Sequence, residues 1–109
     1  MATTYKVLGQ SNPSATTATS LYTVPAATQT IVSTITVCNQ NASAGTYRIA
    51  VRPAAAALAK QHYVAYDVSL PGNASDTLTL GITVDATDVI TVYASSATMS
   101  FSAFGSEIA

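Results

Sequence analysis

The sequence predicts an all-β fold: a two-layer antiparallel β-sandwich, immunoglobulin-like or jelly-roll, with about seven or eight short strands. Three observations predict it. Apolar and hydroxyl-bearing residues alternate with a period of two along most of the chain. Gly, Pro, Asn and Asp interrupt this alternation roughly every ten to twelve residues, as turns between short strands do. No long segment has helical composition, so nothing supplies the crossovers that a parallel sheet needs.

The first twenty residues are predicted to form an extended arm and loop in front of the sandwich domain, which spans residues 21–109. Residues 4–8 have the composition of a short strand, but the segment GQSNPSATTATS after them holds too few apolar side chains to pack into a core. Residues 21–24 then form a short strand that stops at Pro25, because a residue without an N–H is confined to the end or edge of a strand. We therefore expect flexibility and docking contacts in the arm.

The next predicted strand, residues 29–39, is the longest, and both of its faces look suited to burial. Ile31, Ile35 and Val37 share one face. Cys38, close to the end of the strand, is expected to be a small buried apolar residue. The strand ends in a turn that is rich in Asn and Gly.

Residues 46–52 are predicted to form a strand with an unambiguous apolar face. This strand alternates Tyr47, Ile49 and Val51 with Arg48, Ala50 and Arg52. The Ala-rich segment after it, residues 53–61, is too short to be a stable helix by itself. We expect a connecting loop or a single helical turn there.

Four further strands are predicted in the second half of the chain: residues 62–70, 76–84, 89–94 and 97–104. In the first of them, Tyr66 is in phase with Val64 and Val68, which places its ring in the core, and Tyr63 lies on the opposite face. Residues 76–84 read as one unbroken, half-buried strand, and residues 85–88 as the hairpin turn that follows it.

Composition excludes several classes of protein. Only 8% of the 109 residues are charged, and four Lys or Arg against five Asp or Glu give a net charge of -1. A chain so close to neutral lacks the charge that drives binding to nucleic acid or anionic membranes, so we expect neither partner. The single cysteine excludes an internal disulfide. Without a basic and apolar leader at the N-terminus, we expect a soluble protein made in the cytoplasm.

The residues that carry chemistry are few, and the sequence predicts no enzyme, no cofactor and no metal site. His62 and Cys38 could act as a nucleophile pair only if the fold brings them together, and the alternative is a half-exposed histidine at a strand start. The turn at Asp85 and Asp88, even with Asp76, has fewer oxygens than Ca²⁺ requires. Short Asp side chains in such turns more often accept hydrogen bonds from nearby backbone N–H groups.

Candidate interface residues are Tyr5, Lys6, Arg48, Arg52 and Tyr63. Arg48 and Arg52 lie on one face of one strand in a chain with only two arginines. They either point into solvent or reach a carboxylate across a subunit contact, where arginine is enriched. Tyr5 and Lys6 belong to the arm, which can add as a strand to the open sheet edge of a neighbour.

The segments YTVPA (22–26), VCN (37–39), RIAVRP (48–53) and the hairpin from TLGIT to VYAS give the chain a resemblance to known proteins. Over residues 21–108 it resembles small virion proteins of tailed bacteriophages, among them phages of cyanobacteria. The resemblance implies a structural role in the virion, most simply as a head decoration or cement protein that binds the outer capsid surface and stabilises the shell. A tail, baseplate or fibre component is the first alternative.

The implied partners are the major capsid protein, or tail proteins, and copies of the chain itself in a homo-oligomer. The second alternative, a carbohydrate-binding module on the particle, has less support from the sequence. Such sites present exposed aromatic rings, whereas this chain has no Trp and two Phe, and most of its six Tyr alternate in phase with aliphatic residues.

Overall fold

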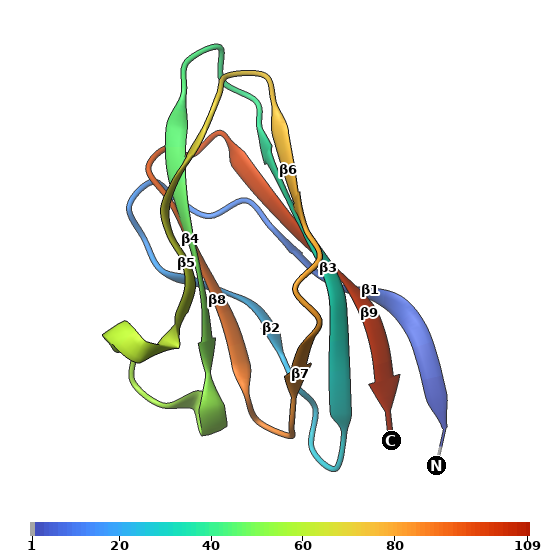
Figure 1. The fold of residues 1–109 in the computed structure, drawn as a ribbon. Helices are drawn as coiled ribbons and strands as arrows, with labels where there is room; N and C mark the ends of the chain where they lie inside the picture. The colour runs from blue at the N-terminus through green and yellow to red at the C-terminus, as the bar shows by residue number, and fades with distance from the viewer. Residues whose placement is uncertain (1) are drawn as a thin grey trace.

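The computed structural model describes residues 2–109, which form nine strands and two short 3₁₀ turns (Figure 1). The strands are β1 (Thr3–Ser11), β2 (Thr19–Thr23), β3 (Gln29–Asn39), β4 (Gly45–Arg52), β5 (Tyr63–Leu70), β6 (Ser75–Leu78), β7 (Ile82–Val84), β8 (Val89–Ala94) and β9 (Met99–Ile108). The 3₁₀ turns η1 (Pro53–Ala55) and η2 (Lys60–His62) lie between β4 and β5. Within the described residues, no helix is long and apolar enough to cross a membrane.

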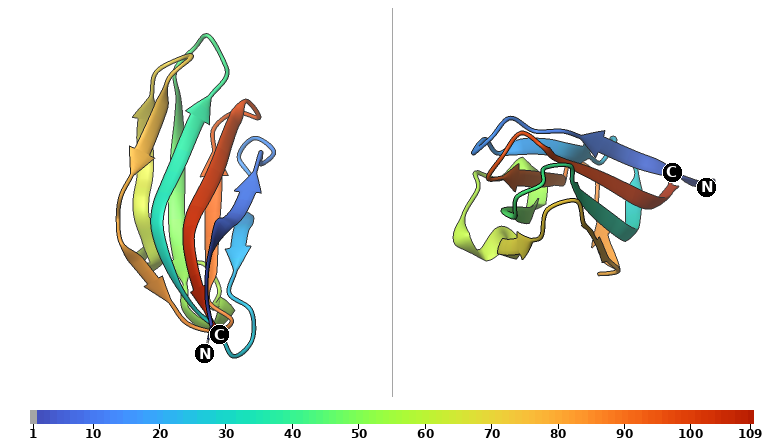
Figure 2. Two further views of the ribbon diagram at one scale, coloured as in Figure 1. Left: turned by 90° about the vertical axis from the view of Figure 1, so that its right-hand side faces the viewer. Right: turned by 90° about the horizontal axis from the view of Figure 1, so that it is seen from above.

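The strands form two antiparallel sheets that pack face to face, which confirms the predicted sandwich (Figure 2). Sheet A has the order β1-β9-β3-β6, with β7 also paired to β3, and sheet B has the order β2-β8-β4-β5. The pairs β1–β9, β2–β8, β3–β6 and β4–β5 are nested one inside the next along the sequence. This is one long antiparallel ribbon rolled up on itself, so the strand order is that of a jelly roll rather than of an immunoglobulin domain.

The core lies between the sheets and is filled by the inward side chains of both. Its largest fully buried members include Tyr47, Phe101, Ile35, Ile49 and Leu70. The rings of Tyr47 and Phe101 meet edge to face across the two sheets, with centroids 6.1 Å apart. The Tyr47 hydroxyl reaches the rim of the core and donates a hydrogen bond to Asp76 Oδ2 at 2.8 Å. Burial, followed by this bond, raises the pKa of Tyr47 above its ordinary value.

The single strand predicted at residues 76–84 is two strands in the structure. The sandwich therefore has one strand more than the upper end of the predicted seven or eight. β6 and β7 pair with different parts of β3, and the backbone leaves the sheet between them. Gly81 lies in this break with φ of +63°, a conformation that glycine adopts without steric cost. In an unbroken strand, alternation would place Leu80 on the same buried face as Leu78 and Ile82, whereas in the structure Leu80 is exposed.

β-Bulges in two other strands change which side chains face the core. The register of β3 shifts between Val32 and Thr34, so that Val32 is buried, Ile31 is exposed, and only one face of the strand lies in the core. Cys38 is exposed on the outer face, so its predicted burial was also wrong. A bulge inserts an extra residue into one strand. Beyond the bulge, each side chain points to the face opposite to the one that simple alternation predicts.

In β5 the register shifts twice, and the predicted burial of Tyr66 was wrong. Tyr47 pairs with Val68 and Ile49 with Ala65, which leaves Tyr66 and Asp67 together opposite Arg48. Asp67 has φ of +50°. Tyr66 therefore points outward and is 57% exposed.

Most of the segment expected to be an arm is part of the sandwich. β1 pairs with β9 along nearly its whole length, and residues 12–18 form the loop that leads to β2. Ala2 and Ala109 exchange backbone hydrogen bonds, so the two ends of the chain lie side by side (Figures 1 and 2). The outward edge of β1 is open at Thr3–Val7, while its far half approaches β2, where Gly9 faces the Leu21 carbonyl.

A buried amide holds together the turns at one end of the sandwich. Asn39 is 1% exposed. Its Nδ2 donates to the carbonyl oxygens of Ser43 at 3.0 Å, Leu70 at 3.3 Å and Pro71 at 3.3 Å. Its Oδ1 accepts the backbone N–H of Asn41 at 3.0 Å. One side chain thus satisfies backbone groups from both the β3–β4 and the β5–β6 connections.

Candidate functional site

The five candidate interface residues fall into two groups on different sheets. Tyr5 and Lys6 lie on β1 in sheet A, whereas Arg48 and Arg52 lie on β4 and Tyr63 begins β5, both in sheet B. The outer faces of the two sheets point in opposite directions (Figure 2). The structure therefore offers two separate surfaces.

The first surface is an apolar patch on the outer face of sheet A, here called the sheet-A patch. It consists of Tyr5, Val7, Ile31 and Phe104, with Ser33 and Ser106 between them, around a shallow hollow of about 610 Å³. Tyr5 is the most exposed apolar side chain described, at 83%, and Val7 is 49% exposed. Val7 pairs with Phe104, which places both side chains on the same side of the sheet. The patch continues to the open edge of β1.

Lys6 also borders this hollow, but its ammonium turns to the inner side of β1. Its Nζ donates to Glu107 Oε1 at 3.1 Å, and the Tyr22 hydroxyl donates to Glu107 Oε2 at 2.5 Å. The hydrogen bond from Tyr22, followed by the interactions with Lys6, lowers the pKa of Glu107 despite its partial burial. Burial and this bond raise the pKa of Tyr22 to about 12. Lys6 therefore fixes the end of the sandwich and does not contribute its charge to the sheet-A patch.

The second surface is built around Arg48, on the outer face of sheet B. The Arg48 Nε donates to Asp67 Oδ1 at 2.7 Å, and Nη2 to Oδ2 at 3.4 Å. The guanidinium carbon lies 4.2 Å from the ring centroid of Tyr66 on one neighbouring strand and 4.2 Å from that of Tyr93 on the other. Arg48 thus makes a charge-assisted fork and two cation–π contacts within its own chain.

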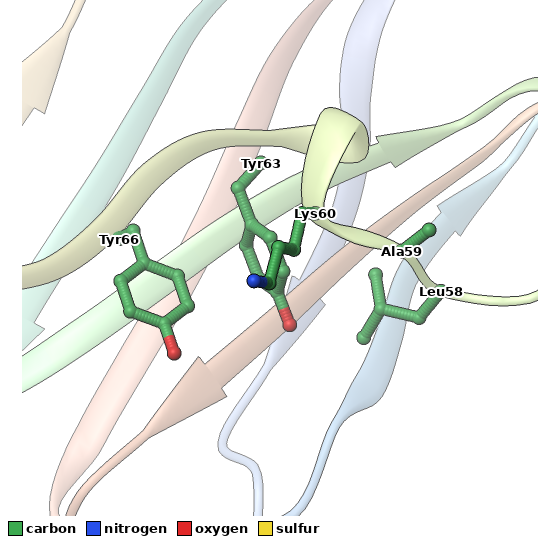
Figure 3. A pocket seen from close by; sticks show the side chains of 5 residues that line it. All are labelled: Leu58, Ala59, Lys60, Tyr63 and Tyr66. Atoms are coloured by element: carbon green, nitrogen blue, oxygen red, sulfur yellow. The ribbon is translucent and has the colours of Figure 1, made fainter.

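A groove next to this cluster is lined by Leu58, Ala59, Lys60, Tyr63 and Tyr66, and is here called the tyrosine groove (Figure 3). It has a volume of about 710 Å³ and is open to solvent. The rings of Tyr63 and Tyr66 meet edge to face, with centroids 4.9 Å apart. Their hydroxyls point to the same side in Figure 3, and Leu58 lies at the far end of the groove from Tyr66.

Arg52 holds one wall of this groove in place. Its Nε donates to Thr91 Oγ1 at 3.0 Å, and its Nη1 to the Ala56 carbonyl at 3.1 Å. Segment 53–62 packs over β4 and β8, so that Ala50 and Thr91 are buried although they face outward. The segment contains two 3₁₀ turns, in line with the expected loop or single helical turn.

His62 and Asp88, which were considered for catalysis and metal binding, make local structural contacts. His62 is buried, not half-exposed as expected, and its Nδ1 accepts the Ala59 N–H at 3.0 Å. Asp88 accepts the N–H groups of Asp85 and Ala54, each at 2.8 Å, as predicted for a turn aspartate. Among residues 2–109, no group of three His, Cys, Asp or Glu is placed to hold a metal ion.

Sequence reasoning missed Tyr66, Asp67 and Tyr93 as partners of Arg48, and Lys60 and Leu58 as part of the groove. Strict alternation assigned Tyr66 to the core, and only the bulge at Asp67 reverses that. The one available signal was the cluster of Tyr63, Tyr66 and Lys60 within a few residues of each other.

Comparisons with protein families, with curated proteins and with solved structures find no match to this chain.

Proposed function

We propose that this protein is a structural component of a bacteriophage particle, most simply a head decoration protein that binds the outside of the capsid shell. The observation that carries the proposal is the sheet-A patch beside the open edge of β1. Exposed apolar side chains grouped on one face of a small domain are typical of a protein-binding surface. The resemblance of residues 21–108 to phage virion proteins is the reason for proposing that the particle is a bacteriophage.

The open edge at Thr3–Val7 is suited to pairing with an extended segment of a shell protein. Its backbone N–H and C=O groups are free to extend sheet A, and Tyr5 and Val7 then bury their side chains against the partner. The other sheet edges are less suited to pairing: β2 has five residues, β5 contains two register shifts, and β6 and β7 are separated by a break.

The charge of the protein suits attachment in many copies. A net charge of -1 lets neighbouring copies sit close together on a shell without strong repulsion. A modest contact per copy is sufficient when each copy bridges neighbouring shell subunits, because bridging raises the effective concentration of the second contact.

The first test is immunogold electron microscopy of the particles whose genome encodes this chain, with an antibody raised against the purified protein. Dense label over the heads supports decoration. Label restricted to the tail assigns the protein to the tail, baseplate or fibre, and unlabelled particles refute the virion proposal.

The second test maps the docking surface. Val7→Ser should reduce sedimentation of the protein with purified shells, whereas the matched control Leu80→Ser, also at an exposed aliphatic residue, should not. Equal binding by both variants would exclude the sheet-A patch as the contact. Sedimentation velocity of the free protein tests whether copies also associate with one another, and loss of an oligomer in Val7→Ser would assign this patch to self-association.

A further inference from the structure

The tyrosine groove has the character of a ligand site rather than of an ordinary sheet surface. It combines two tyrosine rings, an exposed leucine and a lysine on the outer face of a sheet whose core is already complete. The two rings contact each other, and Tyr66 also contacts Arg48, but the groove that they line is open to solvent. The groove is also distinct from the sheet-A patch, since it lies on the opposite sheet.

The aromatic rings of the groove are held in place before any ligand binds. Tyr66 is fixed by the Arg48 guanidinium and by the edge-to-face contact with Tyr63. Arg48 is itself fixed by Asp67 and Tyr93. A ligand that stacks on these rings therefore loses little free energy to ordering side chains.

The charge of the groove indicates an anionic ligand. The positive charge of Arg48 is compensated by Asp67 at 2.7 Å. The other ion pair described is Lys6–Glu107, on β1 and β9 of sheet A, so within residues 2–109 the Lys60 ammonium has no carboxylate partner. Lys60 is thus an uncompensated cation among the residues that line the groove, beside two tyrosine hydroxyls. Arg52, which holds the groove wall, bonds to Thr91 and the Ala56 carbonyl and likewise has no carboxylate partner within residues 2–109.

We propose that the tyrosine groove binds an acidic saccharide, a pyranose chain that carries carboxylates. The polarised C–H groups on one face of a pyranose ring match the negative face of a tyrosine ring. The sugar hydroxyls can form hydrogen bonds with the tyrosine hydroxyls, and a hexuronate carboxylate can form an ion pair with Lys60.

A peptide suits this groove less well. The neighbouring sheet edge is β5, where the two register shifts and the positive φ of Asp67 interrupt the regular backbone groups that an added strand needs. Binding here would rely on side chains alone, which a rigid sugar ring uses better than a flexible peptide does. On a particle docked through sheet A, the groove would face outward, where repeated weak sites add up.

The inference is tested by titrating ¹⁵N-labelled protein with tetragalacturonate and with its methyl ester, which keeps the rings and removes the charge. Tetragalacturonate should shift the amide signals of the segment from Leu58 to Asp67 in a saturable way, and the ester should bind about three- to tenfold more weakly. Lys60→Gln should bring the affinity for the acid down to that for the ester.

Tyr66→Ala should weaken binding of both sugars about tenfold. Its matched control is Tyr5→Ala, which removes the most exposed tyrosine from the other sheet and should bind as the unmodified protein does. The amide spectrum of each variant reports whether the fold is intact. If Tyr66→Ala unfolds, Tyr63→Phe, which removes one hydroxyl and keeps the ring, is the replacement and should weaken binding by about threefold.

Three results would overturn the inference: no saturable shift up to about 10 mM tetragalacturonate, equal binding of the acid and the ester, or equal or tighter binding of hexaglutamate at the same residues. The last would identify an acidic peptide as the ligand. None of these results depends on where, or whether, the protein attaches to a particle.

Discussion

The amide of Asn39 provides the sharpest test of how the turns of this sandwich are held. Asn39→Asp changes the side-chain shape very little but replaces the donor Nδ2 with an oxygen. That oxygen would face the carbonyl oxygens of Ser43, Leu70 and Pro71, which are now 3.0–3.3 Å from the nitrogen. The substitution thus converts donor–acceptor contacts into contacts between acceptors.

The expected loss follows from the number of bonds. An amide has two hydrogens to share among these carbonyls, and a buried hydrogen bond contributes about 1 kcal/mol net, so at least ~2 kcal/mol is lost. Because the site is only 1% exposed, the unpaired carbonyls and the new charge raise this to about 2–4 kcal/mol at pH 7. For a domain of this size the melting temperature should fall by roughly 10–25 °C.

The pH dependence has a definite sign. Burial and the facing carbonyls raise the pKa of an aspartate at position 39 above its ordinary value of about 3.9, because the charged form is disfavoured in the folded state. The protonated form can again donate one hydrogen bond. The deficit relative to the unmodified protein is therefore largest at neutral pH and shrinks as the pH falls below the raised pKa.

Urea unfolding followed by circular dichroism at pH 7 and at about pH 4 measures both effects. The matched control is Asn41→Asp, because Asn41 uses only its Oδ1, which accepts the Ser43 N–H at 3.2 Å and is preserved by the substitution. This control should change the free energy of unfolding by less than about 0.5 kcal/mol. Equal losses for the two variants, or a deficit at position 39 that grows on acidification, would refute the reasoning.

Three further outcomes are expected. Gly105→Ala should lower the free energy of unfolding by about 3 kcal/mol in the same urea assay, since a Cβ there would collide with the Ile31 carbonyl on the adjacent strand. The pKa of Glu107 is lowered in the folded state, so its stabilising effect is fully present above about pH 4.5 and is lost as the pH falls through the folded-state pKa. Glu107→Gln should therefore flatten this part of a profile of unfolding free energy against pH. Arg48→Lys keeps the charge but loses the fork to Asp67 and the fit against two tyrosine rings, and it should lower the melting temperature.

The sandwich could be predicted because alternation is a direct consequence of strand geometry. In β4, for example, Tyr47 and Ile49 are fully buried and Arg48 faces outward, as the sequence pattern indicates. The choice between a jelly roll and an immunoglobulin-like order depends on which distant strands pair. Local alternation carries no information on that pairing, so both orders stayed open.

The site could be predicted only in part because bulges are not encoded by alternation. Arg48 was identified as informative from its position, but its partner Tyr66 was assigned to the core, because the count of residues along β5 assumed a regular strand. The bulge at Asp67 places an extra residue in β5, and Tyr66 therefore points outward. Ile31 in β3 was misplaced for the same reason.

The central place of β9 in sheet A has a consequence for how the protein is made. β9 lies between β1 and β3, and its partners in β1 lie roughly a hundred residues earlier in the chain. Until residues 99–108 have left the ribosome, β1 has no strand to pair with, and β3 lacks the strand with which it pairs over the greatest length. Sheet A therefore closes only after synthesis of this region, and the early strands stay exposed to aggregation during that interval. Fragments that stop before β9 should be the species that chaperones hold or proteases remove.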